Sequence, residues 1–102
     1  MPVEVDLKEL LLALGDVLKR AELHGEHSVT MEPLSVRERM SRVMASLQQT
    51  PYTEFHKLFT PEEGRGGIVV TFLALLELLK ERIIEVVQNE PLGQLYVKSM
   101  GE

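Results

Sequence analysis

The stretch IVVTFLALLELLKERIIEVVQ, residues 68–88, decides the fold of this chain. Its first twelve residues hold ten apolar side chains and are interrupted only by Thr71 and Glu77. A surface helix of a small globular protein is apolar along one stripe, whereas a helix of this composition is apolar on nearly every side. The sequence therefore predicts a helix with two apolar faces. The second face must be buried by another part of the chain or by a partner.

Spacing of about 100° per residue divides this helix into two ridges. The first ridge holds Val70, Ala74 and Leu78, near Thr71 and Leu75, and the second holds Val69, Phe72, Leu73, Leu76 and Leu79. Ala74 lets two helix backbones approach closely, whereas Phe72 and Leu76 are large side chains of the kind found at interface centres. We therefore predict that the second ridge faces a partner at least in part. The alternative is a central helix that the chain's own hairpin and N-terminal helix cover on both sides.

The segments around this helix predict a winged-helix domain over residues 33–99. Ser35 and Glu38 form a capping box that starts a helix, and Pro51 ends it. A short helix, TEFHKLF, is predicted to start at a Thr53 cap, and the glycines of TPEEGRGG, 60–67, indicate a turn. The long helix then runs from about residue 67 to residue 82, and the alternating segments IIEVVQ and QLYVKS predict a hairpin. The fold class is mostly α (α+β), because three helices followed by a β ribbon is the order of a winged helix.

An amphipathic helix is predicted before this domain, over residues 5–23. Its apolar seam consists of Leu7, Leu10, Leu14, Val17 and Ala21, and Leu11 and Leu18 widen it. Asp6 is placed to cap its start. Two interpretations remain open, a helix packed on its own domain and an arm that binds another chain. The predicted organisation is an amphipathic segment 1–24, a polar linker 25–32 and the winged-helix domain 33–99.

The composition of the chain excludes several classes of function. At 102 residues it is one domain, or one domain with an attached arm, and a net charge of −5 argues against a main affinity for phosphate backbones. The N-terminus has no signal-peptide pattern, and the longest apolar run is too short to span a membrane. We therefore expect a cytoplasmic protein that does not contact a membrane.

The sequence also predicts a protein that is not an enzyme and holds no metal or cofactor. There is no cysteine, and no acid–base pair has a pocket context. His24, Glu26 and His27 lack further ligands at a recognisable spacing. His56 is expected to be a surface histidine.

Winged helices often read DNA with their third helix, but here this helix has no base-reading side chain before Lys80 and Arg82. The alternative function is nevertheless a winged-helix DNA-binding transcription regulator. In that case four arginines would meet phosphates, namely Arg37, Arg39, Arg42 and Arg65. A solvated face is the other interpretation of the first three arginines.

Two blocks, PLSVRERMSRVM (33–44) and FLALLELLKERIIEVVQNEPLGQLYV (72–97), resemble the C-terminal part of bacterial kleisins, the segregation and condensation protein A family. The shared features are the F-L-A-L-L-E-L core, the strand that ends in Q-x-E, and the P-x-G turn before a final x-L-Y-V strand. The resemblance covers about residues 30–98, and residues 5–23 fit the preceding segment more loosely.

The resemblance implies a scaffold that acts in chromosome condensation and segregation. In this family the C-terminal winged helix docks on the ATPase head of an SMC protein, and segregation and condensation protein B holds the middle of the chain. The positions implied for the SMC head are Val69, Phe72, Leu73, Leu76 and Leu79, with Gln88 and Tyr96 as weaker candidates. The seam of Leu7, Leu10, Leu14 and Val17 is the expected contact with a second partner.

The resemblance also implies a location at the nucleoid and contact with DNA only through the complex. The chain departs from the family by its length, because it has no counterpart of the N-terminal domain that binds an SMC neck. We therefore expect that it does not close a ring by itself. Self-association through the second ridge is a further prediction.

Overall fold

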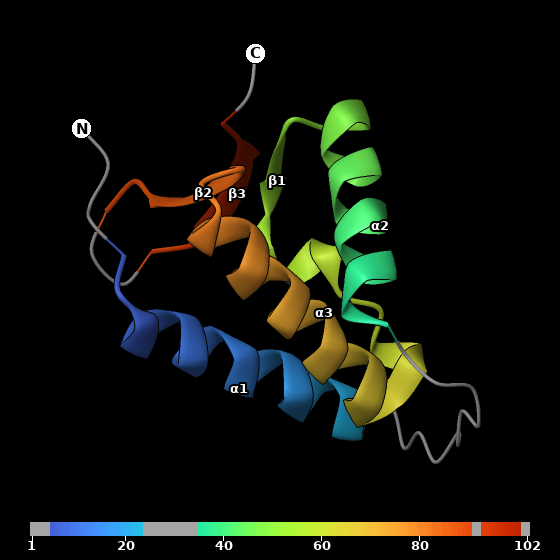
Figure 1. Ribbon diagram of the computed structural model, residues 1–102. Coiled ribbons are helices and arrows are strands. Elements are labelled where there is room, and N and C mark those ends of the chain that lie inside the picture. The colour runs from blue at the N-terminus through green and yellow to red at the C-terminus, as the bar shows by residue number, and fades with distance from the viewer. Residues whose placement is uncertain (1–4, 24–34, 91–92, 101–102) are drawn as a thin grey trace.

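The computed structural model describes residues 5–23, 35–90 and 93–100 (Figure 1). The predicted linker, residues 25–32, lies outside these residues. So do the three side chains considered as metal ligands, His24, Glu26 and His27. The elements, in chain order, are α1 (Leu7–Leu23), α2 (Val36–Gln49), β1 (Tyr52–Glu54), η1 (Phe55–Leu58), η2 (Pro61–Glu63), α3 (Gly64–Lys80), β2 (Ile84–Gln88) and β3 (Leu95–Ser99).

Both predicted helix starts are capped as the sequence indicates. The Asp6 carboxylate accepts a hydrogen bond from the Glu9 backbone N–H at 3.2 Å. The Ser35 hydroxyl accepts one from the Glu38 backbone N–H at 3.1 Å. Each bond satisfies a backbone donor that has no partner within its own helix.

The segment after α2 differs from its prediction. Thr53 caps no helix, because it lies within strand β1, where its buried hydroxyl donates to the Thr50 carbonyl at 2.6 Å. The short helix is a 3₁₀ turn that starts only at Phe55. Strand β1 is too short to show an alternating pattern and pairs with β3, more than 40 residues later, as in Thr53 opposite Val97.

The turn predicted over residues 60–67 was wrong at its C-terminal end, because α3 begins at Gly64 and continues through the glycines. Gly64 itself has φ 80° and ψ −174°, a conformation that only glycine adopts readily. A Cβ on Gly67 would lie 2.5 Å from the Glu63 Cβ. The glycines therefore make the tight entry into the helix rather than prevent it.

Helix α3 ends at Lys80 in a Schellman motif, two residues before the predicted end. Arg82 adopts a left-handed conformation with φ 61°. Its N–H donates to the Leu79 carbonyl at 3.0 Å, and the Ile83 N–H donates to the Leu78 carbonyl at 2.9 Å. This turn reverses the chain directly into the predicted hairpin of β2 and β3.

The molecule has an α+β winged-helix-like fold. The antiparallel sheet has the strand order β1-β3-β2, and α3 lies between α1 and α2 (Figure 1). One apolar core joins all three helices to the sheet, and its most enclosed members are Leu47, Ile68, Leu75, Leu78 and Val97. Helix α1 contributes Leu10, Val17 and Ala21 to this same core, as the first of its two interpretations predicts.

Candidate docking surface on helix α3

The first ridge of α3 packs inside the molecule, as its small side chains predict. Ala74 is 0% exposed, and Val70 and Leu78 are also buried. The neighbouring Thr71 accepts a hydrogen bond from Arg39 of α2 at 3.1 Å, which places this side of α3 against α2. The alanine allows the close approach of the two helices.

The second ridge is divided between core and surface. Val69 is 38% exposed and Leu73 is 46% exposed, although the helix is otherwise largely buried. Leu76 and Leu79 are half-buried and pack against the core. We call Val69, Leu73 and Leu76 the outer face of α3.

The prediction that Phe72 faces outward was wrong, because Phe72 is 5% exposed and belongs to the core. Its neighbours on the helix explain this position. Arg65, seven residues earlier and so on the same side of α3, pairs with Glu22 of α1 at 3.2 Å. Leu79, seven residues later, borders a groove together with Val5 and Leu10 from the α1 end of the chain. Phe72 therefore lies on the side that α1 covers.

The two weaker candidates on the hairpin have different environments. Gln88 is 3% exposed, and its amide N–H donates to the Gly93 carbonyl at 2.9 Å, so this residue joins the hairpin ends instead of offering a surface. Tyr96 is half-buried, and its ring stacks on Tyr52 with the centroids 4.8 Å apart. Tyr52 is 46% exposed and was not among the predicted positions, because β1 was not predicted.

The seam of α1 faces α3 rather than a second partner. Leu10 and Val17 are buried in the core, and Leu14 is half-buried, so only Leu7 of the predicted set is exposed. The exposed leucines of α1 also include Leu11, which was predicted to widen the seam, and Leu12, which the seam did not contain.

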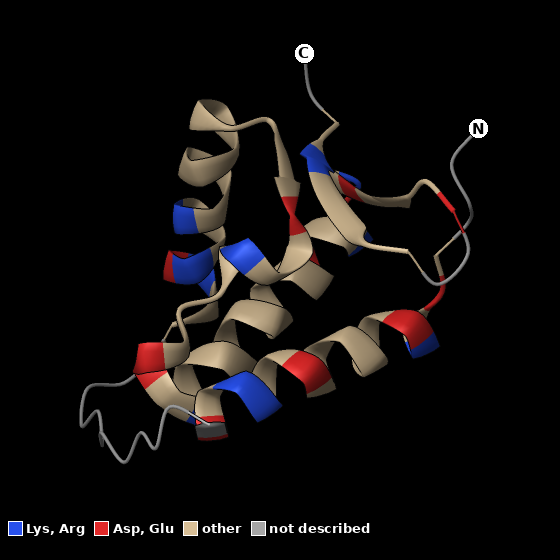
Figure 2. Cartoon of the chain, turned by 180° about the vertical axis from the view of Figure 1, so that it is seen from behind, with Lys and Arg blue, Asp and Glu red and all other residues tan. Residues whose placement is uncertain are grey.

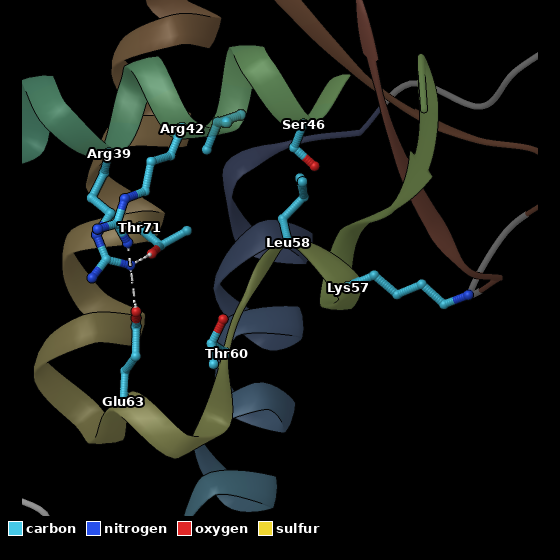
Figure 3. Close-up of a pocket in the computed structure, with 9 residues that line it drawn as sticks. Arg39, Arg42, Ser46, Lys57, Leu58, Thr60, Glu63 and Thr71 are labelled. Atoms are coloured by element: carbon cyan, nitrogen blue, oxygen red, sulfur yellow. Dashed lines mark hydrogen bonds and ion pairs between the residues drawn. The ribbon is translucent and has the colours of Figure 1, made fainter. Parts of the chain in front are cut away.

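The arginines of α2 do not form a continuous basic face. Arg39 donates to the Glu63 carboxylate at 2.7 Å and to the Thr71 hydroxyl, and its side chain is only 12% exposed (Figure 3). Arg42 is exposed and lies 3.9 Å from the same carboxylate. Both signs of charge lie along α1 and α2 (Figure 2). Arg39 therefore ties α2 to the start of α3, and the solvated face predicted for it was wrong.

The described residues contain one close histidine–carboxylate pair. His56 lies 2.6 Å from the Glu54 carboxylate, and both side chains are about 30% exposed. Among residues 5–23, 35–90 and 93–100 there is no cluster of three or more histidine and acidic side chains that could hold a metal ion. Within the same part of the chain, none of the helices has the length and apolar content needed to cross a membrane.

Known proteins share clear sequence similarity with this chain. The sequence model of the family described as Segregation and condensation protein ScpA matches residues 1–100. The chain belongs to this family. A segregation and condensation protein A of Xylella fastidiosa (strain 9a5c) is 52% identical over 101 residues, which cover 99% of this chain and 33% of the relative.

Two further relatives named segregation and condensation protein A have lower identity. The protein of that name from Coxiella burnetii (strain RSA 493 / Nine Mile phase I) is 49% identical over 96 residues, which cover 94% of this chain and 36% of the relative. The one from Myxococcus xanthus (strain DK1622) is 39% identical, with 97% and 35% covered. The chain thus spans about a third of the length of these curated relatives. No solved structure matches it.

Proposed function

We propose that this chain is a non-catalytic kleisin segment that docks its winged helix on the ATPase head of an SMC protein and acts in chromosome condensation and segregation. The relatives named segregation and condensation protein A support the cellular role. A cytoplasmic location at the nucleoid follows from the same proposal, as does contact with DNA only through the complex.

One observation carries the docking proposal, namely the exposure of Leu73 and Val69 in the middle of an otherwise buried helix. Covering such side chains is favourable, at about 25 cal/mol per Å² of apolar surface removed from water. Leu76 extends this face toward α1, and Tyr96 remains a second, weaker candidate on the sheet. Phe72 and Gln88 are no longer part of the proposed surface, because this chain already buries them.

The alternative of a transcription regulator has less support. Of the four arginines expected at phosphates, Arg39 and Arg65 are engaged by the carboxylates of Glu63 and Glu22. The middle of α3, residues 68–79, carries no basic side chain and one acid, Glu77. A helix of this composition would bring its apolar face and one negative charge to the major groove, where donors and cations are needed.

Co-purification of the full chain with an isolated SMC head tests the proposal. We expect a stoichiometric complex that Leu73→Arg weakens by ~10-fold or more, because a charge would be placed inside a desolvated contact. Gln48→Arg adds the same charge to an exposed position of α2 and is the matched control. No complex with the wild-type chain would contradict head docking, and equal binding by both variants would contradict the chosen face.

The predicted contact between α1 and protein B remains a separate proposal. Of its four residues, Leu7 is exposed, whereas Leu10 and Val17 are buried against the rest of the domain. Parallel co-purification with protein B tests it, with Leu7→Arg as the variant.

A further inference from the structure

One face of α1 borders the end of the hairpin. Glu9, Ala13 and Asp16 follow one another at steps of four and three residues, so they lie on the same side of this helix. Between this face and the hairpin lies a hollow of about 230 Å³, whereas a single water needs only about 10–15 Å³ of such space. The residues that line it are Glu9, Leu12, Ala13 and Asp16 of α1 and Gln88, Gly93 and Leu95 of the hairpin. The first half of α1 and the far end of the hairpin thus form two walls of one hollow (Figure 1).

The wall on the hairpin side contains a buried acceptor without a partner. Gln88 is 3% exposed, and its side-chain amide N–H donates to the Gly93 carbonyl at 2.9 Å. Because that partner is a carbonyl oxygen, the amide nitrogen must face it, and the amide oxygen points away from Gly93. This Oε1 atom is enclosed and accepts no hydrogen bond from the described residues. Buried acceptors are nearly always paired, so an unpaired one in the wall of a hollow points to a donor that enters the hollow.

The wall on the α1 side contains a second such acceptor. The Glu9 side chain is half-buried, and its Oε1 atom is enclosed and has no partner in the part of the chain that the structure describes. Of all the described residues, only Glu9 and Gln88 have an enclosed side-chain oxygen or nitrogen without a partner, and both line this one hollow. Two acceptors from different elements therefore converge on the same space.

The charge of the hollow is negative. Its described lining residues include two acids, Glu9 and Asp16, and no lysine or arginine. The adjoining hollow, between α1 and η1, shares Asp16 but is also lined by Arg20, whose positive charge offsets that of Asp16 in part. The negative charge is therefore concentrated at the Glu9 end. Leu12 and Leu95 add apolar surface beside it.

From these observations we infer that the hollow binds an arginine side chain of a partner polypeptide. A guanidinium supplies the positive charge and several N–H donors, which the two unpaired oxygens require. Arginine suits a partly enclosed ion pair better than lysine, because its cation is more weakly hydrated and its donors form a rigid, planar fork. Its methylene stem would pack on Leu12 at the rim.

The occupant must come from outside these 102 residues. All eleven lysines and arginines of the chain lie in its described part, and none of them lines the hollow. The inference goes beyond the proposed function and does not rest on it, because the exposed Val69 and Leu73 belong to α3 and line no part of this hollow.

The test uses the full chain and a small analogue of an arginine residue. N-acetyl-L-arginine methylamide is titrated into the isotope-labelled chain, and NMR follows the side-chain amide of Gln88 and the backbone amides of Ala13 and Leu95. We expect saturable shifts at these three positions, with a dissociation constant on the order of 10 mM for so small a ligand. The matched ligand is N-acetyl-L-citrulline methylamide, which keeps the shape of arginine without its charge. It should bind about 10-fold more weakly.

A matched pair of glutamates tests the same hollow from the protein side. Glu9→Gln keeps the size of the side chain and removes its negative charge, so we expect the arginine analogue to bind about 10-fold more weakly. Glu38→Gln is the control, because each glutamate is the third residue of its helix and donates its N–H to the cap, Asp6 or Ser35. Glu38 is exposed and does not line the hollow, so its variant should bind like the wild-type chain. Amide spectra and thermal melts check that both variants fold.

Three results would overturn the inference. The first is the absence of saturable shifts at Gln88 with the arginine analogue up to about 50 mM. The second is equal binding of the arginine and citrulline analogues, since a neutral donor would then suffice. The third is equal binding by Glu9→Gln and Glu38→Gln, which would place the cation elsewhere. None of them touches the proposed docking through α3, because these titrations contain no SMC head and leave Leu73 unchanged.

Discussion

Adjacent residues of α3 should respond very differently to truncation, and the structure gives the size of the difference. Phe72 is 5% exposed and lies in the core, where phenylalanine-to-alanine changes cost about 3–5 kcal/mol. Leu73 is 46% exposed, so it keeps about half of the ~1.5–3 kcal/mol that a fully buried leucine contributes. We therefore expect Leu73→Ala to lower the free energy of unfolding by about 1 kcal/mol, and Phe72→Ala by at least twice as much.

Urea denaturation followed by circular dichroism at 222 nm measures both values. A domain of this size has a total stability of about 5–15 kcal/mol, so the loss at Phe72 would be a large part of it. An arginine at Phe72 would then abolish binding by unfolding the domain, whereas an arginine at Leu73 would report on the surface. Equal losses for the two alanine variants would refute the assignment of Phe72 to the core and Leu73 to the surface.

Four further predictions concern glycines, a turn and a helix cap. Gly15→Ala should raise the stability by up to about 1 kcal/mol, because the new Cβ meets nothing within 4 Å. Gly67→Ala should lower it by about 1–3 kcal/mol through a clash with Glu63, and thermal melts that show the same sign for both variants would contradict this. Arg82→Gly should raise the free energy of unfolding by about 0.5–1 kcal/mol and so move the urea midpoint upward, since φ is 61° there, and a downward shift would argue against the Schellman turn. Ser35→Ala should cost about 1 kcal/mol at the start of α2, and an unchanged midpoint would show that the cap is unimportant.

Local signals in the sequence predicted most of the elements. The caps at Asp6 and Ser35, the helix end before Pro51 and the alternating hairpin strands all act between residues close in the chain. The three-residue strand β1 had no such signal, because its structure comes from pairing with β3. The glycines before α3 indicated a turn because clustered glycines usually interrupt helices. In the structure Gly67 is helical, and a Cβ there would collide with Glu63.

The candidate surface was predicted only in part. Periodicity placed Val69, Phe72 and Leu73 on one ridge, and side-chain size selected this ridge for a partner. Size was a poor guide to Phe72, because a large aromatic side chain suits the core of a domain as well as an interface. The exposed Leu12 was missed because it lies off the predicted seam of α1, which is largely the buried side of the helix.

The sequence by itself determined that this chain has a central helix with more apolar surface than one neighbour covers, within a winged-helix order of elements. That follows from composition and spacing, which depend on nothing outside the segment. Only the tertiary structure decided how the surplus is divided, because the packing of α1 against α3 buries Phe72 and leaves Leu73 in water. Such packing joins residues about 50 positions apart in the chain, and a helical period cannot show which side a distant helix will cover.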